Sequence, residues 1–155
     1  MKEGELDLSR FAPGESFLIN AETEGLLNDM DINSDIRYRE GTMSANVNLK
    51  NILAENSPIG ISGKVDTRDL DIGTVIGTDL IGEASIRADI DGIIGNGDTP
   101  SSAAINSFNV DKLHIYGYDY TKIYGEGDVS AEAFDGRITC DDPNLNFIFQ
   151  GRFGI

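Results

Sequence analysis

The sequence has 155 residues, with a single cysteine, a single histidine and no tryptophan. A lone cysteine, Cys140, excludes an internal disulfide framework and any multi-cysteine zinc site. A lone histidine, His114, excludes every metal motif that needs a histidine pair. The lack of tryptophan also weakens a carbohydrate-binding role.

Basic residues are scarce: 12 Lys and Arg stand against 27 Asp and Glu, for a net charge of −15. This is the wrong sign for neutralising phosphates or for docking on anionic headgroups, so we expect no nucleic-acid partner. Long apolar runs are also missing, and the opening "MKEGELDLSR" has no signal-peptide core. The length suits a single domain over residues 1–155, and an exported or anchored protein would contain it as a fragment.

Strict alternation of apolar and polar residues fills most of the chain. In "TMSANVNLK", Val47 and Leu49 share one parity while Asn46 and Asn48 share the other, which is typical of a half-buried strand. The same pattern recurs in "IGISGKVD", "EASIRADID", "FDGRITCD" and "LNFIFQGRF". About ten such strands with little helix predict an all-β fold.

The segments between the strands carry turn residues. We expect tight turns at Glu40-Gly41, Asp91-Gly92, Asp135-Gly136 and in "DDPN" at 141–144, and therefore antiparallel meanders. One short helix is expected in "LDIGTVIG", capped by Asp71 and closed by Gly77. The stretch "IIGNGDTPSSAA" predicts an exposed connection. Such strands can form a sandwich, a barrel or a curled open sheet with an apolar inside.

The window Asp29 to Glu40, "DMDINSDIRYRE", has the oxygen spacing of an EF-hand calcium loop. The loop needs a glycine at its sixth position, which is Ser34, and flanking helices. A strand needs only the alternation that the window shows, so we interpret it as a strand and expect no metal site.

The sequence gives little support for a catalytic site. His114 has polar-face parity and no evident nucleophile, and Cys140 shares the inward parity of Ile138. Carboxylate pairs that could serve glycosidase chemistry lie at turns or on solvent faces: Asp69/Asp71, Asp89/Asp91 and Asp141/Asp142. We expect a protein that is not an enzyme and needs no cofactor.

Two binding surfaces remain. The hairpin Tyr116–Tyr124 carries four tyrosines that could bind a glycan or a protein partner, as part of an extracellular β-sandwich. The second is the apolar face, where small residues such as Ala45, Gly63 and Ala88 leave room for an apolar ligand, although small residues also mark bulges. The residues predicted to line such a lipid groove are Val47, Leu49, Ile61, Val65, Ile86, Ile90, Ile138, Phe147 and Phe149.

A series of short sequence patterns carries a family resemblance. The elements "LDIG..IG", "G.ASI.ADIDG", "GY.Y..I...G", "FDG.I...DPN" and "FQGRF" follow one another over residues 55–153. Together they resemble the long periplasmic part of TamB, the translocation and assembly module subunit, within the AsmA-like group.

The resemblance implies a segment of a long curled β-sheet with a hydrophobic interior, the β-taco. It also implies a location in the periplasm of a Gram-negative bacterium, in a full-length protein anchored in the inner membrane. Partners would be phospholipid, or outer-membrane protein segments in transit, and an outer-membrane barrel protein of the TamA type. The family has no catalytic residues to transfer.

Overall fold

The computed structural model describes residues 17–154, which form one eleven-stranded antiparallel sheet and one short helix. The elements are β1 Phe17–Leu26, β2 Asp29–Tyr38, β3 Gly41–Lys50, β4 Ile59–Arg68, β5 Leu70–Asp71, α1 Ile72–Ile76, β6 Ile81–Ile94, β7 Ser102–Ile115, β8 Tyr118–Tyr120, β9 Ile123–Ser130, β10 Ala133–Asp142 and β11 Leu145–Gly154. The opening "MKEGELDLSR" lies outside the described residues.

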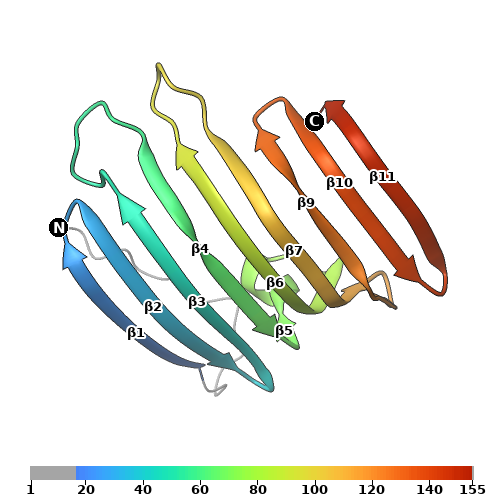
Figure 1. Cartoon of the computed structure of the whole chain (residues 1–155). Coiled ribbons are helices and arrows are strands. Elements are labelled where there is room, and N and C mark those ends of the chain that lie inside the picture. The colour runs from blue at the N-terminus through green and yellow to red at the C-terminus, as the bar shows by residue number, and fades with distance from the viewer. Residues whose placement is uncertain (1–16, 155) are drawn as a thin grey trace.

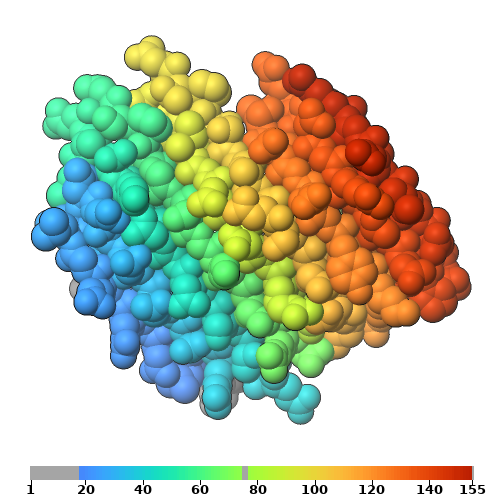
Figure 2. All heavy atoms as spheres, viewed as in Figure 1, coloured from blue at the N-terminus to red at the C-terminus, as the bar shows by residue number. Residues whose placement is uncertain are grey.

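The strands follow one another across the sheet in chain order, β1-β2-β3-β4-β6-β7-β9-β10-β11, with β5 against β6 and β8 against β7 (Figure 1). Bands of successive colour therefore cross the molecular surface from β1 at one edge to β11 at the other (Figure 2). This confirms the predicted all-β meander. The sheet is not closed into a barrel, and no second sheet faces it among residues 17–154, so the sandwich alternative is wrong for them.

Cross-strand register puts the apolar parity of every long strand on the same side. One row of directly paired residues crosses six neighbouring strands: Val65, Ala88, Phe108, Gly125, Ile138 and Phe149. Two irregularities in the β6–β7 register, before Ile86 and before Ile90, keep this parity aligned, because each inserts one residue in β7. We call this side the apolar face and the opposite side the polar face.

Small residues on the apolar face do not leave empty space at the centre of β9 and β10. A Cβ on Gly125 would clash with the ring of Phe108, and one on Gly127 or Gly136 would clash with the ring of Phe134. The ring of Phe108 thus lies over a glycine of the neighbouring strand, and that of Phe134 over glycines of the neighbouring strand and of its own. The expectation that small residues open room for a ligand fails at these positions.

Two of the predicted turns are wrong. Asp91-Gly92 lies inside β6 and Asp135-Gly136 inside β10. Neither glycine has the positive φ that a tight hairpin turn demands, and Gly136 pairs with glycines on both neighbouring strands. The turn after β2 falls at Arg39-Glu40, one residue earlier than predicted, whereas the "DDPN" turn joins β10 to β11 as expected.

The predicted helix is α1, which lies behind one end of the sheet against β6 (Figure 1). The side chain of Asp71 accepts a hydrogen bond from the Thr74 backbone N–H at 3.0 Å, and Gly77 ends the helix in the left-handed conformation. The predicted long connection after β6 is shorter than expected, because β6 continues to Ile94 and β7 begins at Ser102.

Candidate functional site

The nine predicted groove residues all lie on the apolar face, in two groups. In the first group, Leu49 pairs directly with Ile61, and Val47 and Ile90 both pair with Gly63. The first group is Val47, Leu49, Ile61, Val65, Ile86 and Ile90, on β3, β4 and β6. The second group is Ile138, Phe147 and Phe149, on β10 and β11.

None of these nine side chains is fully buried. Eight are half-buried, and Phe147 is exposed at 38% of its surface. The fully buried apolar residues are Tyr38, Ala45, Leu70, Ala84, Val110, Ala133, Phe134 and Cys140. No second layer of described strands packs on the apolar face. Much of this face therefore stays accessible to solvent.

Aromatic rings gather at the β11 end of the apolar face. The ring of Phe149 lies 5.4 Å from that of Phe153 in an edge-on contact, and both rings approach Phe134, at 6.4 and 5.5 Å. Such ring pairs contribute stability beyond that of the apolar area that they bury. They form a cluster of three rings at this end of the apolar face.

The polar face carries ladders of hydrogen-bonded and charged side chains. The side-chain amide of Asn48 donates to Asp29 at 2.8 Å and to Asp31 at 2.9 Å, and that of Asn106 donates to Asp89 and Asp91. These contacts join neighbouring strands across the face. The Asp29 window is therefore a strand over Asp29–Tyr38, as predicted, and ends in the turn at Arg39-Glu40.

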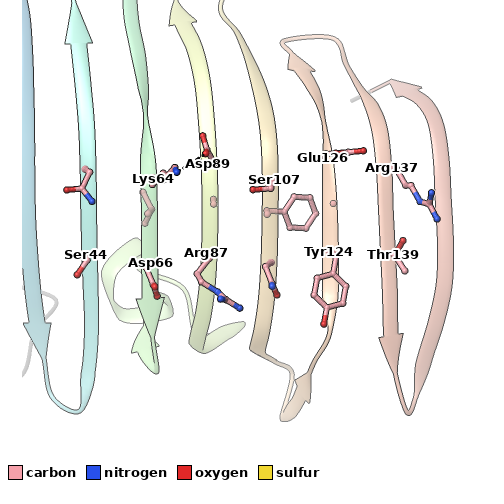
Figure 3. A pocket seen from close by; sticks show the side chains of 16 residues that line it. Ser44, Lys64, Asp66, Arg87, Asp89, Ser107, Tyr124, Glu126, Arg137 and Thr139 are labelled. Carbon is pink, nitrogen blue, oxygen red and sulfur yellow. Dashed lines mark ion pairs between the residues drawn. The ribbon is translucent and has the colours of Figure 1, made fainter.

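A hollow of about 840 Å³ lies on the polar face over the middle of the sheet (Figure 3). Charged residues of both signs line it in equal number: Lys64, Arg87 and Arg137 against Asp66, Asp89 and Glu126. Lys64 and Asp89 form an ion pair at 3.6 Å. Because the lining carries equal numbers of basic and acidic residues, it favours neither an anionic nor a cationic ligand.

The hollow was not anticipated from sequence. Of the nine predicted groove residues, only Val65 is among its lining residues. Alternation identifies which residues share a face, but the bending that hollows one face depends on the twist of the assembled strands. The polar parity of residues such as Lys64 and Arg137 was the only available signal.

The carboxylate of Asp142 is buried. Asp142 accepts hydrogen bonds from the Tyr118 hydroxyl at 2.7 Å, from the backbone N–H of Thr121 at 2.8 Å and its hydroxyl at 3.1 Å, and from the Asn144 N–H at 2.9 Å. Burial by itself raises the pKa of this carboxyl, but these four donors outweigh it and hold the pKa at about 2. The same contact raises the pKa of the Tyr118 phenol. Asp142 thus ties the β8 hairpin to the β10–β11 turn.

The other candidate catalytic groups have structural partners. His114 lies on the opposite face from Leu113, as predicted, with its Nδ1 2.6 Å from Asp119. Cys140 is 1% exposed, which confirms the prediction that it points inward. Asp71 caps α1, and the side chain that contacts His114 is a carboxylate, that of Asp119. Within residues 17–154, no three His, Cys, Asp or Glu side chains are grouped to hold a metal ion.

The four tyrosines do not form one surface. Tyr118 and Tyr120 pair with Ile115 and Leu113, and their rings meet edge-on at 4.7 Å. Tyr124 instead lines the polar hollow (Figure 3), so it faces the other way. The hairpin therefore offers no continuous aromatic platform.

Among the helices described, none is both long and apolar enough to cross a membrane. No family model, curated protein or solved structure matches the chain.

Proposed function

We propose that this chain is a non-enzymatic module that shields phospholipid acyl chains from water on its apolar face. The observation that carries the proposal is the half-exposed apolar face itself, which continues through register-paired rows from β3 to β11. No layer of described strands covers it, and it lies opposite a face made of charged and amide groups.

Burial of hydrocarbon provides the driving force. Each methylene removed from water contributes about 0.8 kcal/mol, so an acyl chain gains free energy along the rows without needing any directional contact. Because the force is not directional, a bound chain can slide from one row to the next. The headgroup would remain in water at the rim of the sheet.

The proposed setting is the periplasm of a Gram-negative bacterium, as part of a TamB/AsmA-like protein anchored in the inner membrane. An outer-membrane barrel protein of the TamA type would be reached through the full-length protein. The resemblance over residues 55–153 and the single open sheet support this setting. Outer-membrane protein segments are the second candidate cargo on the same face.

Adjacent residues of one strand provide matched controls for a test, because they point to opposite faces. A photo-crosslinking amino acid at Val47 or Phe147, in protein exported to the periplasm, should capture phospholipid. The same amino acid at Asn48 or Asn146 should capture none. Mass spectrometry of the crosslinked species identifies the cargo.

A charge on the apolar face gives the second measurement. Val47→Arg should retain the folded sheet, because the half-exposed position lets the guanidinium reach water, while lipid capture at Phe147 falls. Circular dichroism checks the fold. Unfolding by Val47→Arg together with no lipid at Val47 or Phe147 would show an ordinary packed core and end the proposal.

A further inference from the structure

The hollow on the polar face is built from two parallel rows of polar side chains. Each row crosses β3, β4, β6, β7, β9 and β10, and the rows lie two residues apart along every strand. The first row is Ser44, Asp66, Arg87, Asn109, Tyr124 and Thr139, and the second is Asn46, Lys64, Asp89, Ser107, Glu126 and Arg137. All of them line the hollow (Figure 3), which therefore lies within the sheet and involves neither β1 nor β11.

The two rows give the hollow an elongated shape. Neighbouring strands lie about 4.8 Å apart, so each row is about 24 Å long, whereas two residues along a strand separate the rows by about 7 Å. The volume of about 840 Å³ falls within the range of small-molecule sites. This shape suits an extended chain lying across the strands better than a compact molecule.

Charged groups in the hollow already have partners within the protein. Lys64 pairs with Asp89 inside the hollow at 3.6 Å, and Arg87 pairs with Asp111, outside the lining, at 3.1 Å. A charged ligand would compete with these pairs, and an anionic polymer would also meet the net charge of −15. The lining therefore favours a ligand without net charge.

Other polar groups in the hollow lack a partner. In the part of the chain that the structure describes, Glu126 and Arg137 lie opposite each other on β9 and β10, but no ion pair joins them. Within the same part, the Oδ1 atom of Asn109 is buried without a hydrogen-bond partner, which is rare for a buried acceptor. A hydroxyl both donates and accepts, so it can bond to a carboxylate, a guanidinium or an amide. A ligand rich in hydroxyls would satisfy all three groups, with a rotation of the Asn109 side chain.

Tyr124 adds an aromatic surface beside these groups. Its side chain is 43% exposed, and Figure 3 shows its ring nearly face-on in a view onto the polar face. A tyrosine ring has an apolar face and a polar tip, so it can stack on the flat side of a sugar while its hydroxyl bonds to the rim. In a chain without tryptophan, tyrosine is the residue that can do both.

We propose that the hollow on the polar face binds a neutral oligosaccharide that lies across the strands. One sugar stacks on Tyr124, and its hydroxyls bond to Asn109, Glu126 and Arg137. A pyranose unit is close in length to the strand spacing of about 4.8 Å, whereas an extended peptide repeats every 3.4 Å or so and would bring apolar side chains against the charged rows. The proposal does not depend on what the apolar face binds, because the two sites lie on opposite faces.

Isothermal titration calorimetry of the purified chain tests the class of ligand. The neutral probes are cellopentaose, chitopentaose, xylopentaose and mannopentaose, and at least one should bind saturably. Two charged probes of the same length, anionic pentagalacturonate and the cationic deacetylated form of chitopentaose, should bind more weakly. Tighter binding of a charged probe, or no saturable binding of any neutral probe, would overturn the proposal.

Substitutions in the hollow test the site. Tyr124→Ala should weaken binding about tenfold, because the stacking surface is lost, whereas Tyr124→Phe should retain most of the affinity. Arg137→Ala should also weaken binding. Tyr116→Ala is the matched control, since this tyrosine is 79% exposed and lies outside the lining. Circular dichroism selects folded preparations, and affinity unchanged in both Tyr124→Ala and Arg137→Ala would refute the site.

A variant of the opposite face separates this site from the lipid site. Val47→Arg should leave sugar binding unchanged even where it reduces lipid capture. Loss of sugar binding by folded Val47→Arg would place the sugar on the apolar face and contradict the proposal. Binding of a neutral peptide that depends on Tyr124, with no sugar bound, would assign the hollow to a protein partner and contradict it equally.

Discussion

At the scale of single residues, the polar contacts differ in how much they contribute to stability. The ion pair between Arg87 and Asp111 joins two exposed side chains, and such pairs contribute about 0–1 kcal/mol each. Asp142 is different, since it is 3% exposed and accepts four hydrogen bonds from three residues. Removing one partner of such a buried network leaves donors without acceptors.

Asp142→Asn should therefore lower the melting temperature by several degrees at neutral pH, because the amide nitrogen replaces one acceptor oxygen and faces either the two donors of Thr121 or the donors of Tyr118 and Asn144. The folded-state pKa of about 2 lies below the ordinary 3.8, so the carboxylate's stabilisation is complete above pH 3.8 and is lost as the pH falls toward 2. Denaturation of both proteins between pH 2 and 7 should show the stability difference shrinking over that window.

Asp141→Asn is the matched control. This neighbouring carboxylate is exposed and accepts one side-chain hydrogen bond, from Asn146 at 3.0 Å. Its replacement should change stability far less. Equal losses for the two variants, or a stability difference for Asp142→Asn that does not change with pH, would show that the buried network is not what holds the β8 hairpin.

At the scale of elements, β2 shows why a ligand pattern in sequence does not make a metal site. In an extended strand, Asp29 and Asp35 lie roughly 20 Å apart, whereas calcium ligands must all lie within about 2.6 Å of one ion. The carboxylates instead bond to the neighbouring strand, where Ser44 donates to Asp35 at 2.6 Å. The same oxygen spacing thus serves pairing between strands.

Millimolar calcium or excess chelator should leave the melting temperature unchanged, because residues 17–154 group no three acidic, His or Cys side chains whose binding of the ion would add free energy to the folded state. Differential scanning fluorimetry with magnesium as the matched cation measures this. A rise of several degrees that is specific for calcium would revive the EF-hand interpretation of Asp29 to Glu40.

At the scale of the whole molecule, charge opposes compactness. The chain has a net charge of −15, residues 17–154 form a single open sheet, and the exposed ion pairs offset little of the repulsion. Raising the ionic strength from about 0.01 to 0.15 M shortens the screening length from about 30 to 8 Å. The repulsion between strands then weakens more than the short ion pairs do.

The melting temperature at pH 7 should therefore rise with sodium chloride over this range. At a pH near the sequence pI of 4.2, where the net charge is close to zero, the same salt should have little effect or a slightly destabilising one. Thermal melts at the two pH values test this. A salt effect of equal size at both would point to a cause other than net charge.

The sequence by itself determined the strands, their faces and the meander. Residues such as Val47 and Asn48 alternate, and a period of two can bury one side only in a strand. The inward parity of Cys140 and the cap of α1 at Asp71 were likewise local and were predicted correctly. The Asp-Gly pairs misled because a glycine that fits a turn also fits where a neighbouring group approaches closely, as the Ser102 carbonyl approaches Gly92 and the Phe134 ring approaches Gly136.

Only the tertiary structure decided how the faces are covered and shaped. The ring of Phe134 over Gly127 and Gly136, the hollow on the polar face, and the four donors around Asp142 each join residues from different strands. Register and twist bring them together, and both are properties of the assembled sheet, which no single strand carries in its own residue pattern.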